Sequence, residues 1–246
     1  MMEEENKKKN LATPAAIIVA GLVIAGAIAY GNYLGPSAPV KPDATLGPVD
    51  NFMPVSPTDH RRGPAEAALT IVEYSDLECP FCRVFHQTML EIMTAESDVA
   101  WVYRHFPIES LHKKARREAI AAECATVQGD DTAFWKYIDE LFAVTPSNDG
   151  LDPAELPKIA ARVGLDVAKF NSCLAEEDTV SRLNADYDSG VKIGVDGTPF
   201  VLVVKDNLAY PIFRYEVASD IPDREVATLA EKIFSSYEKN IQAARN

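Results

Sequence analysis

Cysteine, histidine and basic side chains are all scarce in this sequence. Four cysteines among 246 residues are too few for a small scaffold held together by disulfides. Lys and Arg together number 24 against 37 Asp and Glu, so the formal net charge is −13. Because phosphate neutralisation needs clustered Lys and Arg, we expect no nucleic-acid binding. With 47% hydrophobic and 25% charged residues, the composition is that of an ordinary globular protein.

Several common active-site motifs are also absent. The chain has no glycine-rich phosphate loop, no G-x-S-x-G and no H-E-x-x-H. None of its histidines has ligand spacing to another, and they are His60, His86, His105 and His112. We therefore expect no metal site and interpret the four as ordinary surface or core residues.

One long uncharged run lies near the N-terminus. Residues 11–30 contain no charge, and three lysines precede them at positions 7–9. A helix of that length matches a hydrocarbon core of roughly 30 Å, and the lysines keep residues 1–10 in the cytoplasm. We expect residues 11–34 to form an uncleaved transmembrane anchor, and a cleaved signal peptide is the alternative. Under either interpretation, the rest of the chain is exported into a compartment that permits disulfides. With the uncleaved anchor, the protein is a single-pass protein of the cell membrane.

Proline is concentrated just after this run. Seven of the 16 prolines lie between residues 35 and 64, and such a stretch cannot form a continuous helix or central strand. We interpret residues 35–57 as a spacer that holds a domain off the membrane. The following residues, 58–62, are a candidate edge strand.

The rest of the sequence predicts the order β-α-β, then many helices, then β-β-α. Short β-branched runs predict the strands, and apolar residues at helical spacing predict the helices. The predicted strands are residues 68–74, 99–106, 200–204 and 208–213, and the predicted helical stretches are 79–97, 112–195 and 222–244. We expect the long middle stretch to break at Gly129, at 146–150, at Pro153 and at 164–166.

Residues 79–82 (CPFC) follow a predicted strand and begin a predicted helix. Thiols at positions i and i+3 of a first helical turn can close a disulfide. The positive end of the helix dipole stabilises the thiolate of the first cysteine and lowers its pKa. A thiol of low pKa is a good leaving group, which makes the pair oxidising. The alternatives are an inert structural disulfide, or a zinc site completed by Cys124 and Cys173.

Three motifs together resemble the DsbA-like thiol:disulfide oxidoreductases of the thioredoxin superfamily, in their membrane-anchored bacterial form. The motifs are residues 73–82 (EYSDLECPFC), 103–107 (YRHFP) and 194–200 (GVDGTPF). The resemblance covers roughly residues 58–240. It implies an α/β, thioredoxin-like fold built from residues 58–108 and 190–246, with a helical domain of residues 109–189 inserted between them.

The resemblance also implies roles for the residues of these motifs. Cys79 is expected to be the exposed nucleophile and Cys82 its redox partner. Pro199 is expected in cis, facing the two cysteines, where it lets the preceding backbone pair with an extended substrate. The residues implied to bind substrate are Pro80, Phe81, Thr198 and Pro199.

Acidic residues flank the cysteines. Glu73 lies in a predicted central strand, where a buried acid is costly and usually functional or paired. By resemblance Glu73 relays a proton to or from Cys82, and the alternative is a partly solvated acid at a strand end. We interpret Asp76 and Glu78 as loop residues that influence a nearby thiol weakly. Phe81 carries neither charge nor hydrogen-bonding group, so stabilisation of the thiolate falls more heavily on backbone N–H groups.

The other two cysteines, Cys124 and Cys173, each lie in a predicted helix. Outside the cytoplasm, two cysteines in one helical domain are expected to pair, so we predict a structural disulfide. The alternative is two buried free thiols that act as small apolar residues.

The sequence therefore predicts an enzyme that introduces disulfides into exported proteins. The rivals are an isomerase or reductase of the same fold, and a redox-silent, membrane-tethered chaperone. The resemblance implies reduced exported proteins as substrates and a membrane, quinone-linked partner of the DsbB or VKOR type. It implies no organic cofactor, and we expect a monomer.

Overall fold

The computed structural model describes residues 47–176, 180–212 and 221–245. Residues 1–46, which hold the expected cytoplasmic tail, the expected anchor and most of the expected spacer, lie outside the described part. Within that part, no helix combines the length and the apolar character needed to cross a bilayer.

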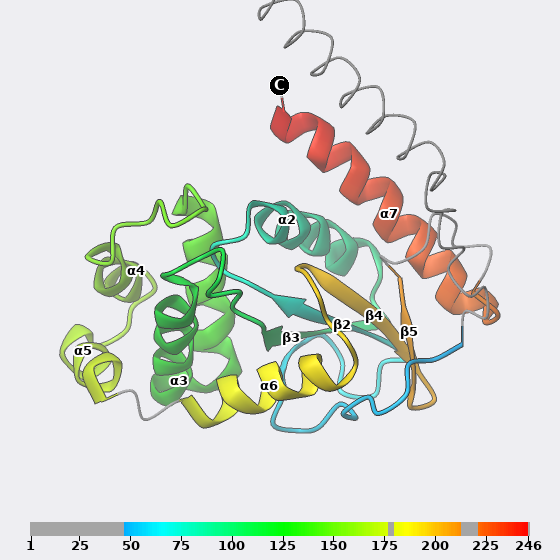
Figure 1. Cartoon of the computed structure of the whole chain (residues 1–246), viewed down its shortest axis with the longest axis horizontal. Helices are drawn as coiled ribbons and strands as arrows, with labels where there is room; N and C mark the ends of the chain where they lie inside the picture. Colours follow the sequence, from blue (N-terminus) through cyan, green and yellow to red (C-terminus); the bar gives the residue numbers. More distant parts are fainter. Residues whose placement is uncertain (1–46, 177–179, 213–220, 246) are drawn as a thin grey trace, which may run out of the picture. The chain divides into compact units, whose positions relative to one another are not determined.

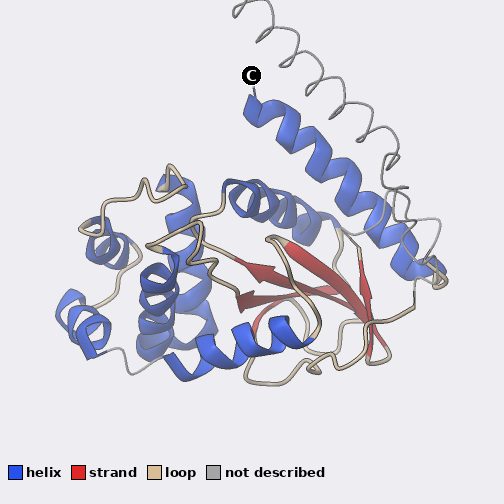
Figure 2. Cartoon of the chain, viewed as in Figure 1, coloured by secondary structure: helices blue, strands red, loops and turns tan. Residues whose placement is uncertain are grey.

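The described strands form one sheet with the order β1-β3-β2-β4-β5, drawn red in Figure 2. The strands are β1 (His60–Arg62), β2 (Leu69–Ser75), β3 (Val99–His105), β4 (Phe200–Lys205) and β5 (Leu208–Pro211). β2 and β3 are parallel, because a helix crosses between them, and the other neighbours are antiparallel. β1 is the edge strand that the sequence predicted, and His60 lies opposite Tyr103.

Helices cover both faces of this sheet and extend beyond one edge. They are α2 (Pro80–Ala95), α3 (Ala115–Val144), α4 (Glu155–Arg162), α5 (Val167–Glu176), α6 (Val180–Lys192) and α7 (Arg224–Arg245). In Figure 1, α2 and α7 lie on one face, α6 lies on the other, and α3, α4 and α5 are grouped to one side. The arrangement is a thioredoxin-like α/β fold with inserted helices, as predicted.

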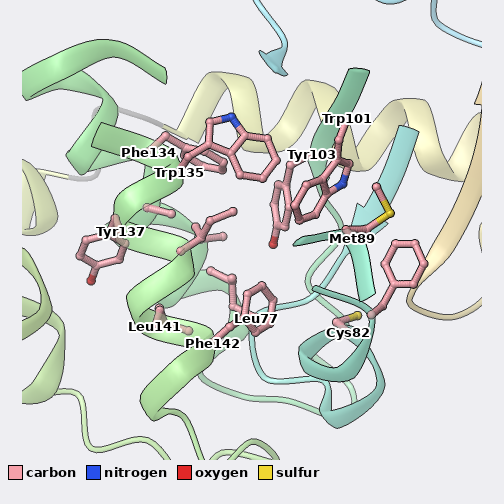
Figure 3. Close-up of a cluster of buried hydrophobic side chains, with 14 of the residues drawn as sticks. Leu77, Cys82, Met89, Trp101, Tyr103, Phe134, Trp135, Tyr137, Leu141 and Phe142 are labelled. Carbon is pink, nitrogen blue, oxygen red and sulfur yellow. The ribbon is translucent and has the colours of Figure 1, made fainter. Parts of the chain in front are cut away.

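The alternation of side chains along the strands divides the core into two clusters. Ile71, Trp101 and Val203 point to the α2 side, where the cluster continues into α3 and α4. Their neighbours Val72 and Leu202 point to the opposite face. Figure 3 shows that the larger cluster, rich in aromatic rings, includes Cys82 at the start of α2. Helix α2, which begins at the cysteine motif, therefore packs directly against this larger cluster.

Residues 47–57 pack onto the domain instead of standing off it. Val49, Phe52 and Val55 contact the second cluster, and the Val49 N–H donates to the Ala209 carbonyl at 2.8 Å. The packed part of the chain therefore begins before residue 58, where the sequence analysis places the domain boundary. The apolar side chains between the prolines explain the difference, because they cover the face of the sheet next to α6.

Helix α3 is interrupted where the sequence predicts a break. Gly129 and Asp130 have non-helical backbone angles, and Asp130 has a φ of 58°. The Asp130 carboxylate accepts a hydrogen bond from the Thr132 N–H at 2.8 Å and so begins the second half of the helix. The kink places both halves against the main core.

Candidate active site

The two cysteines of residues 79–82 stand where strand β2 passes into helix α2. Cys79 is the residue before the helix, and Pro80 takes the first helical position, where its missing N–H costs no hydrogen bond. Cys82 follows within the first turn. Both thiols are free and buried in this structure, and they lie where the positive end of the α2 dipole favours a negative charge. Cys79 is only 5% exposed, so the expectation of an exposed nucleophile is wrong, because the Thr198 backbone packs against its sulfur.

The environments of the two thiols differ sharply. The hydrogen bond from the Cys82 thiol lowers the pKa of Cys79 to about 6, and the N–H groups of Cys82 and Phe81 and the Thr198 side chain act in the same direction. Cys82 is completely buried, and burial raises its pKa well above the usual value, as do the hydrogen bond and charge of Cys79. At neutral pH the pair therefore holds a thiolate at Cys79 and a thiol at Cys82.

Glu73 lies beneath the pair, in the middle of the sheet. Its side chain is 0% exposed, which is inconsistent with a solvated acid at a strand end. Burial raises its pKa to about 8, and the indole N–H of Trp101 donates to its Oε2 at 3.1 Å. The charge of Glu73 also contributes to the raised pKa of Cys82, so the two groups are electrostatically coupled.

The peptide bond between Thr198 and Pro199 is cis and directly precedes strand β4. The Cys79 sulfur lies 3.4 Å from the Thr198 carbonyl, to which it donates a hydrogen bond when it is protonated. The fold thus brings together two motifs that are more than a hundred residues apart, as the resemblance implied.

Phe81 is the exposed member of the motif, with 52% of its surface accessible. Its carbonyl lies 3.4 Å from the Tyr237 hydroxyl of α7, which donates to it. Helix α7 also contacts α2 through an ion pair between Lys232 and Glu96 at 2.6 Å. The closing helix therefore braces the helix that carries the cysteines.

Asp76 and Glu78 are loop residues, as predicted, but both are buried and hydrogen-bonded within the site. The Asp76 carboxylate accepts hydrogen bonds from three donors: the N–H groups of Glu78 and Ile108, and the His112 ring. Glu78 accepts the Asp149 N–H at 2.6 Å. The sequence did not indicate that these two carboxylates hold the loop together. The one local sign of it was the presence of two acidic residues directly before Cys79.

A third carboxyl group comes from the inserted helices. Glu118 of α3 is buried, and burial together with a hydrogen bond to Glu78 raises its pKa to about 10. Glu118 is therefore protonated at neutral pH and donates to the Glu78 carboxylate. This contact ties the loop before Cys79 to the helical insertion.

The structure joins Cys124 of α3 to Cys173 of α5 in a disulfide, as predicted. Because these two sulfurs bond to each other, they do not complete a four-cysteine zinc site with Cys79 and Cys82. The disulfide instead links the two helices within the inserted region.

One cluster of side chains contains nitrogen and oxygen atoms that could ligate a metal ion. Ring nitrogens of His60 and His105 and a carboxylate oxygen of Glu123 lie within 4.8 Å of one another, and all three residues are buried. Glu123 Oε1 already forms hydrogen bonds with the Nε2 atoms of His60 and His105, at 2.8 and 3.1 Å. The Nδ1 atom of His60 forms a hydrogen bond with Asp131 at 2.8 Å. His60 also stacks on Phe134 with 3.6 Å between ring centroids. These hydrogen bonds satisfy the cluster, which spacing along the chain did not reveal.

Comparison with known proteins gives a consistent assignment. A family model described as thioredoxin matches residues 55–214. The crystal structure of DsbA2 from Pseudomonas aeruginosa is 32% identical, with a TM-score of 0.58 over 72% of this chain and 94% of that one. BdbD from Bacillus subtilis, in its oxidised form, is 20% identical, with a TM-score of 0.59 over 80% and 98% of the two chains, and shows the shared fold.

Curated relatives match over one segment only. A Na(+)/H(+) antiporter, NhaA 3 of Salinispora tropica, is 39% identical over 161 residues, which are 65% of this chain and 24% of that protein. Another, NhaA 1 of Salinispora arenicola, is 38% identical over 158 residues, 64% and 23% of the two chains. This chain thus spans about a quarter of the length of these relatives.

Proposed function

The chain belongs to the thioredoxin family as a DsbA-like thiol:disulfide oxidoreductase, and on that premise we propose that it introduces disulfides into exported proteins. The observation that carries the proposal is the contrast between its two active-site thiols. Cys79 has a pKa of about 6, whereas burial raises the pKa of Cys82 well above the usual value. A stable Cys79 thiolate favours the reduced form of the pair, so the disulfide form tends to oxidise other thiols.

The reaction proceeds through a mixed disulfide. A substrate thiolate attacks the Cys79 sulfur of the enzyme disulfide, and the bond to Cys82 breaks. A second substrate thiolate then attacks the substrate sulfur of the mixed disulfide and expels Cys79 as a thiolate. The substrate loses two electrons and two protons. The enzyme gains both electrons and keeps one proton, on Cys82, and the other proton passes to solvent because Cys79 leaves as a thiolate.

Glu73 is suited to supply the proton that Cys82 needs. When Cys82 leaves, it bears a negative charge in a fully buried position, which is unfavourable without a proton. With its pKa at about 8, Glu73 is mainly protonated at pH 7 and can donate that proton toward Cys82. Thr198 and Pro199 would hold the substrate backbone next to Cys79, with Phe81 as an exposed apolar contact.

We further propose that the domain works outside the cytoplasm, beside a membrane. The uncharged run at residues 11–30 supports an anchor, and the disulfide between Cys124 and Cys173 suits an oxidising compartment. The Salinispora relatives are named as antiporters, and exchange of ions takes place across a membrane, which supports a place beside a membrane. A quinone-linked membrane protein of the DsbB or VKOR type is the proposed acceptor of the electrons.

The experiment that tests the proposal is the redox equilibrium of the Cys79–Cys82 pair in the full chain against glutathione. The expected potential is well above that of the cytosolic glutathione pool, and close to roughly −120 mV if the pair is as oxidising as DsbA. A value near that of thioredoxin, about −270 mV, would show a reductant or isomerase instead. If the pair fails to exchange with glutathione at all, a redox-silent binding module becomes the better description.

A further inference from the structure

The loop before Cys79 is organised around Asp76. Through its backbone, Asp76 contacts both cysteines: its carbonyl accepts the Cys79 N–H at 3.1 Å, and its N–H lies 3.5 Å from the Cys82 sulfur. Through its side chain, Asp76 accepts a hydrogen bond from His112 Nδ1 at 2.9 Å. His112 lies in the segment between β3 and α3, so a residue remote in sequence is fastened next to the redox pair.

This pair of charges is buried. Asp76 is 1% exposed and His112 is 7% exposed, so water screens their fields weakly. The Ile108 N–H also donates to Asp76 Oδ2, at 2.8 Å, and the Ile108 carbonyl accepts the His112 N–H at 2.9 Å. Asp76, Ile108 and His112 therefore hold one another in place, and the imidazole has little freedom to turn away.

The balance of interactions favours a charged imidazole. Burial alone would lower the pKa of His112, but the hydrogen bond and charge of Asp76 outweigh burial and raise it. The Cys79 thiolate and Asp149 act in the same direction. The charged groups that face His112 are therefore Asp76 from the active-site loop, Cys79 at the start of α2 and Asp149 from the loop after α3.

The dipeptide between the cysteines offers no such charge. Pro80 and Phe81 are apolar, so the dipeptide itself places no positive charge near Cys79. Lys114 lies close by but is directed elsewhere, because its ammonium group donates to the carbonyls of Asp149 and Leu151 at 2.6 and 2.7 Å. The charge of Cys79 raises the pKa of His112, so the two groups lie within electrostatic reach of each other.

We propose that His112, held in place by Asp76, is the positive charge that stabilises the Cys79 thiolate when that sulfur leaves the mixed disulfide. In this role His112 transfers no proton, so the electron and proton balance of the exchange is unchanged. The inference rests on the proposed function, because it assigns a role within the same thiol exchange. By reciprocity, formation of the thiolate must stabilise the protonated imidazole by the same free energy.

Two substitutions separate charge from hydrogen bonding. His112→Asn keeps an N–H donor that can reach Asp76 but removes the charge, whereas His112→Lys keeps the charge. Lys113→Gln is the matched control, because Lys113 is adjacent in sequence, yet its exposed ammonium group donates to the Glu109 carbonyl. Each variant is made in the full chain, and the thiolate of Cys79 is titrated by its ultraviolet absorption.

The expected result is that His112→Asn raises the pKa of Cys79. A rise of about one half to one corresponds to a loss of roughly three- to tenfold in thiolate stability. The redox equilibrium with glutathione should move toward the disulfide form in the same variant, whereas His112→Lys and Lys113→Gln should stay close to the unmodified chain. An unchanged Cys79 pKa in a folded His112→Asn variant, or an equal change in Lys113→Gln, would overturn the proposal.

A second measurement needs no substitution. The His112 ring is titrated by NMR in the disulfide form and in the dithiol form of the unmodified chain. The pKa of His112 should be higher in the dithiol form, where the Cys79 thiolate is present, and equal values in the two forms would refute the proposal. The first test compares the pKa of Cys79 between closely related variants, and the second compares the pKa of His112 between two redox forms. Neither result depends on whether the absolute potential is that of an oxidant or of a reductant.

Discussion

The two cysteine pairs of this protein contain the same atoms and differ in what surrounds them. Cys79 and Cys82 lie at the start of one helix, where backbone N–H groups lower the pKa of Cys79. Cys124 and Cys173 lie on two different helices, α3 and α5, and join them by a disulfide inside the helical insertion. The first pair is placed for exchange and the second for tethering.

The comparison shows that reactivity depends on which state of the sulfur the surroundings stabilise. Around Cys79, hydrogen-bond donors favour the thiolate, which is the nucleophile and the leaving group. Cys124 is completely buried among apolar side chains, and such surroundings disfavour an ionised thiol. Its bond to Cys173 is therefore expected to stay closed while the other pair opens and closes.

The largest expected effect is the loss of activity when the reactive cysteine pair is removed. Cys79→Ser should reduce the oxidation of a reduced two-cysteine peptide to the uncatalysed rate, because a serine forms no mixed disulfide. The double substitution Cys124→Ala with Cys173→Ala should leave the rate of a folded protein close to that of the unmodified chain. Peptide oxidation followed by mass spectrometry checks both, and a comparable loss in the double variant would contradict the division of roles.

The next largest effect is the loss of stability when the Cys124–Cys173 disulfide is removed. The cysteines that it joins are separated by 49 residues, and removing a disulfide that closes such a loop costs about 2–4 kcal/mol of unfolding free energy. Urea unfolding of the Cys124→Ala, Cys173→Ala variant should show that loss. The reference is the unmodified chain with only the Cys79–Cys82 pair reduced, and an equal unfolding midpoint would argue against a stabilising role.

The smallest expected effect concerns the acid beneath the reactive pair. Because the pKa of Glu73 is raised to about 8 in the folded protein, the folded chain holds a proton there that the unfolded chain has lost. The stability contributed by the neutral carboxyl group is complete below about pH 4 and declines as pH rises toward 8. Glu73→Gln lacks this decline, so its stability relative to the unmodified chain should increase over that range.

Urea unfolding at pH 5 and pH 9 measures this difference. Both proteins are compared in the disulfide form, so that Cys79 and Cys82 do not titrate. In the exchange reaction, the same variant should lose the pH dependence that Glu73 imparts near pH 8, while retaining Cys79 as nucleophile. An identical pH dependence of stability in the two proteins would show that Glu73 is not held neutral by burial.

Much of the fold was predictable because its signals are local. The β-branched run at residues 68–74, the proline that begins α2 and the break at Gly129 each act on their immediate neighbours. The cysteine motif and the Thr198-Pro199 pair were recognisable from residue type and order alone. Their meeting at 3.4 Å followed from the resemblance, because no local property of either segment requires it.

The residues that sequence reasoning underestimated are all polar and buried. Asp76 and Glu78 were interpreted as loop residues of weak influence, and His112 as an ordinary surface or core residue, because no motif in their own segments marks them. Their burial depends on contacts with Ile108 and Asp149, which come from other parts of the chain. A polar residue becomes functional by its burial and its partners, and neither is visible in a short stretch of sequence.

By itself, the sequence determined the order of strands and helices, the location of the redox motif at a helix start, and the presence of two separate cysteine pairs. These follow from side-chain periodicity, from proline and glycine, and from residue identity, which act over a few positions. Only the tertiary structure decided how acidic or basic each group is. Desolvation and hydrogen bonding depend on every segment that packs around a side chain, so the thiolate of Cys79, the neutral Glu73 and the raised pKa of His112 arise only in the folded chain.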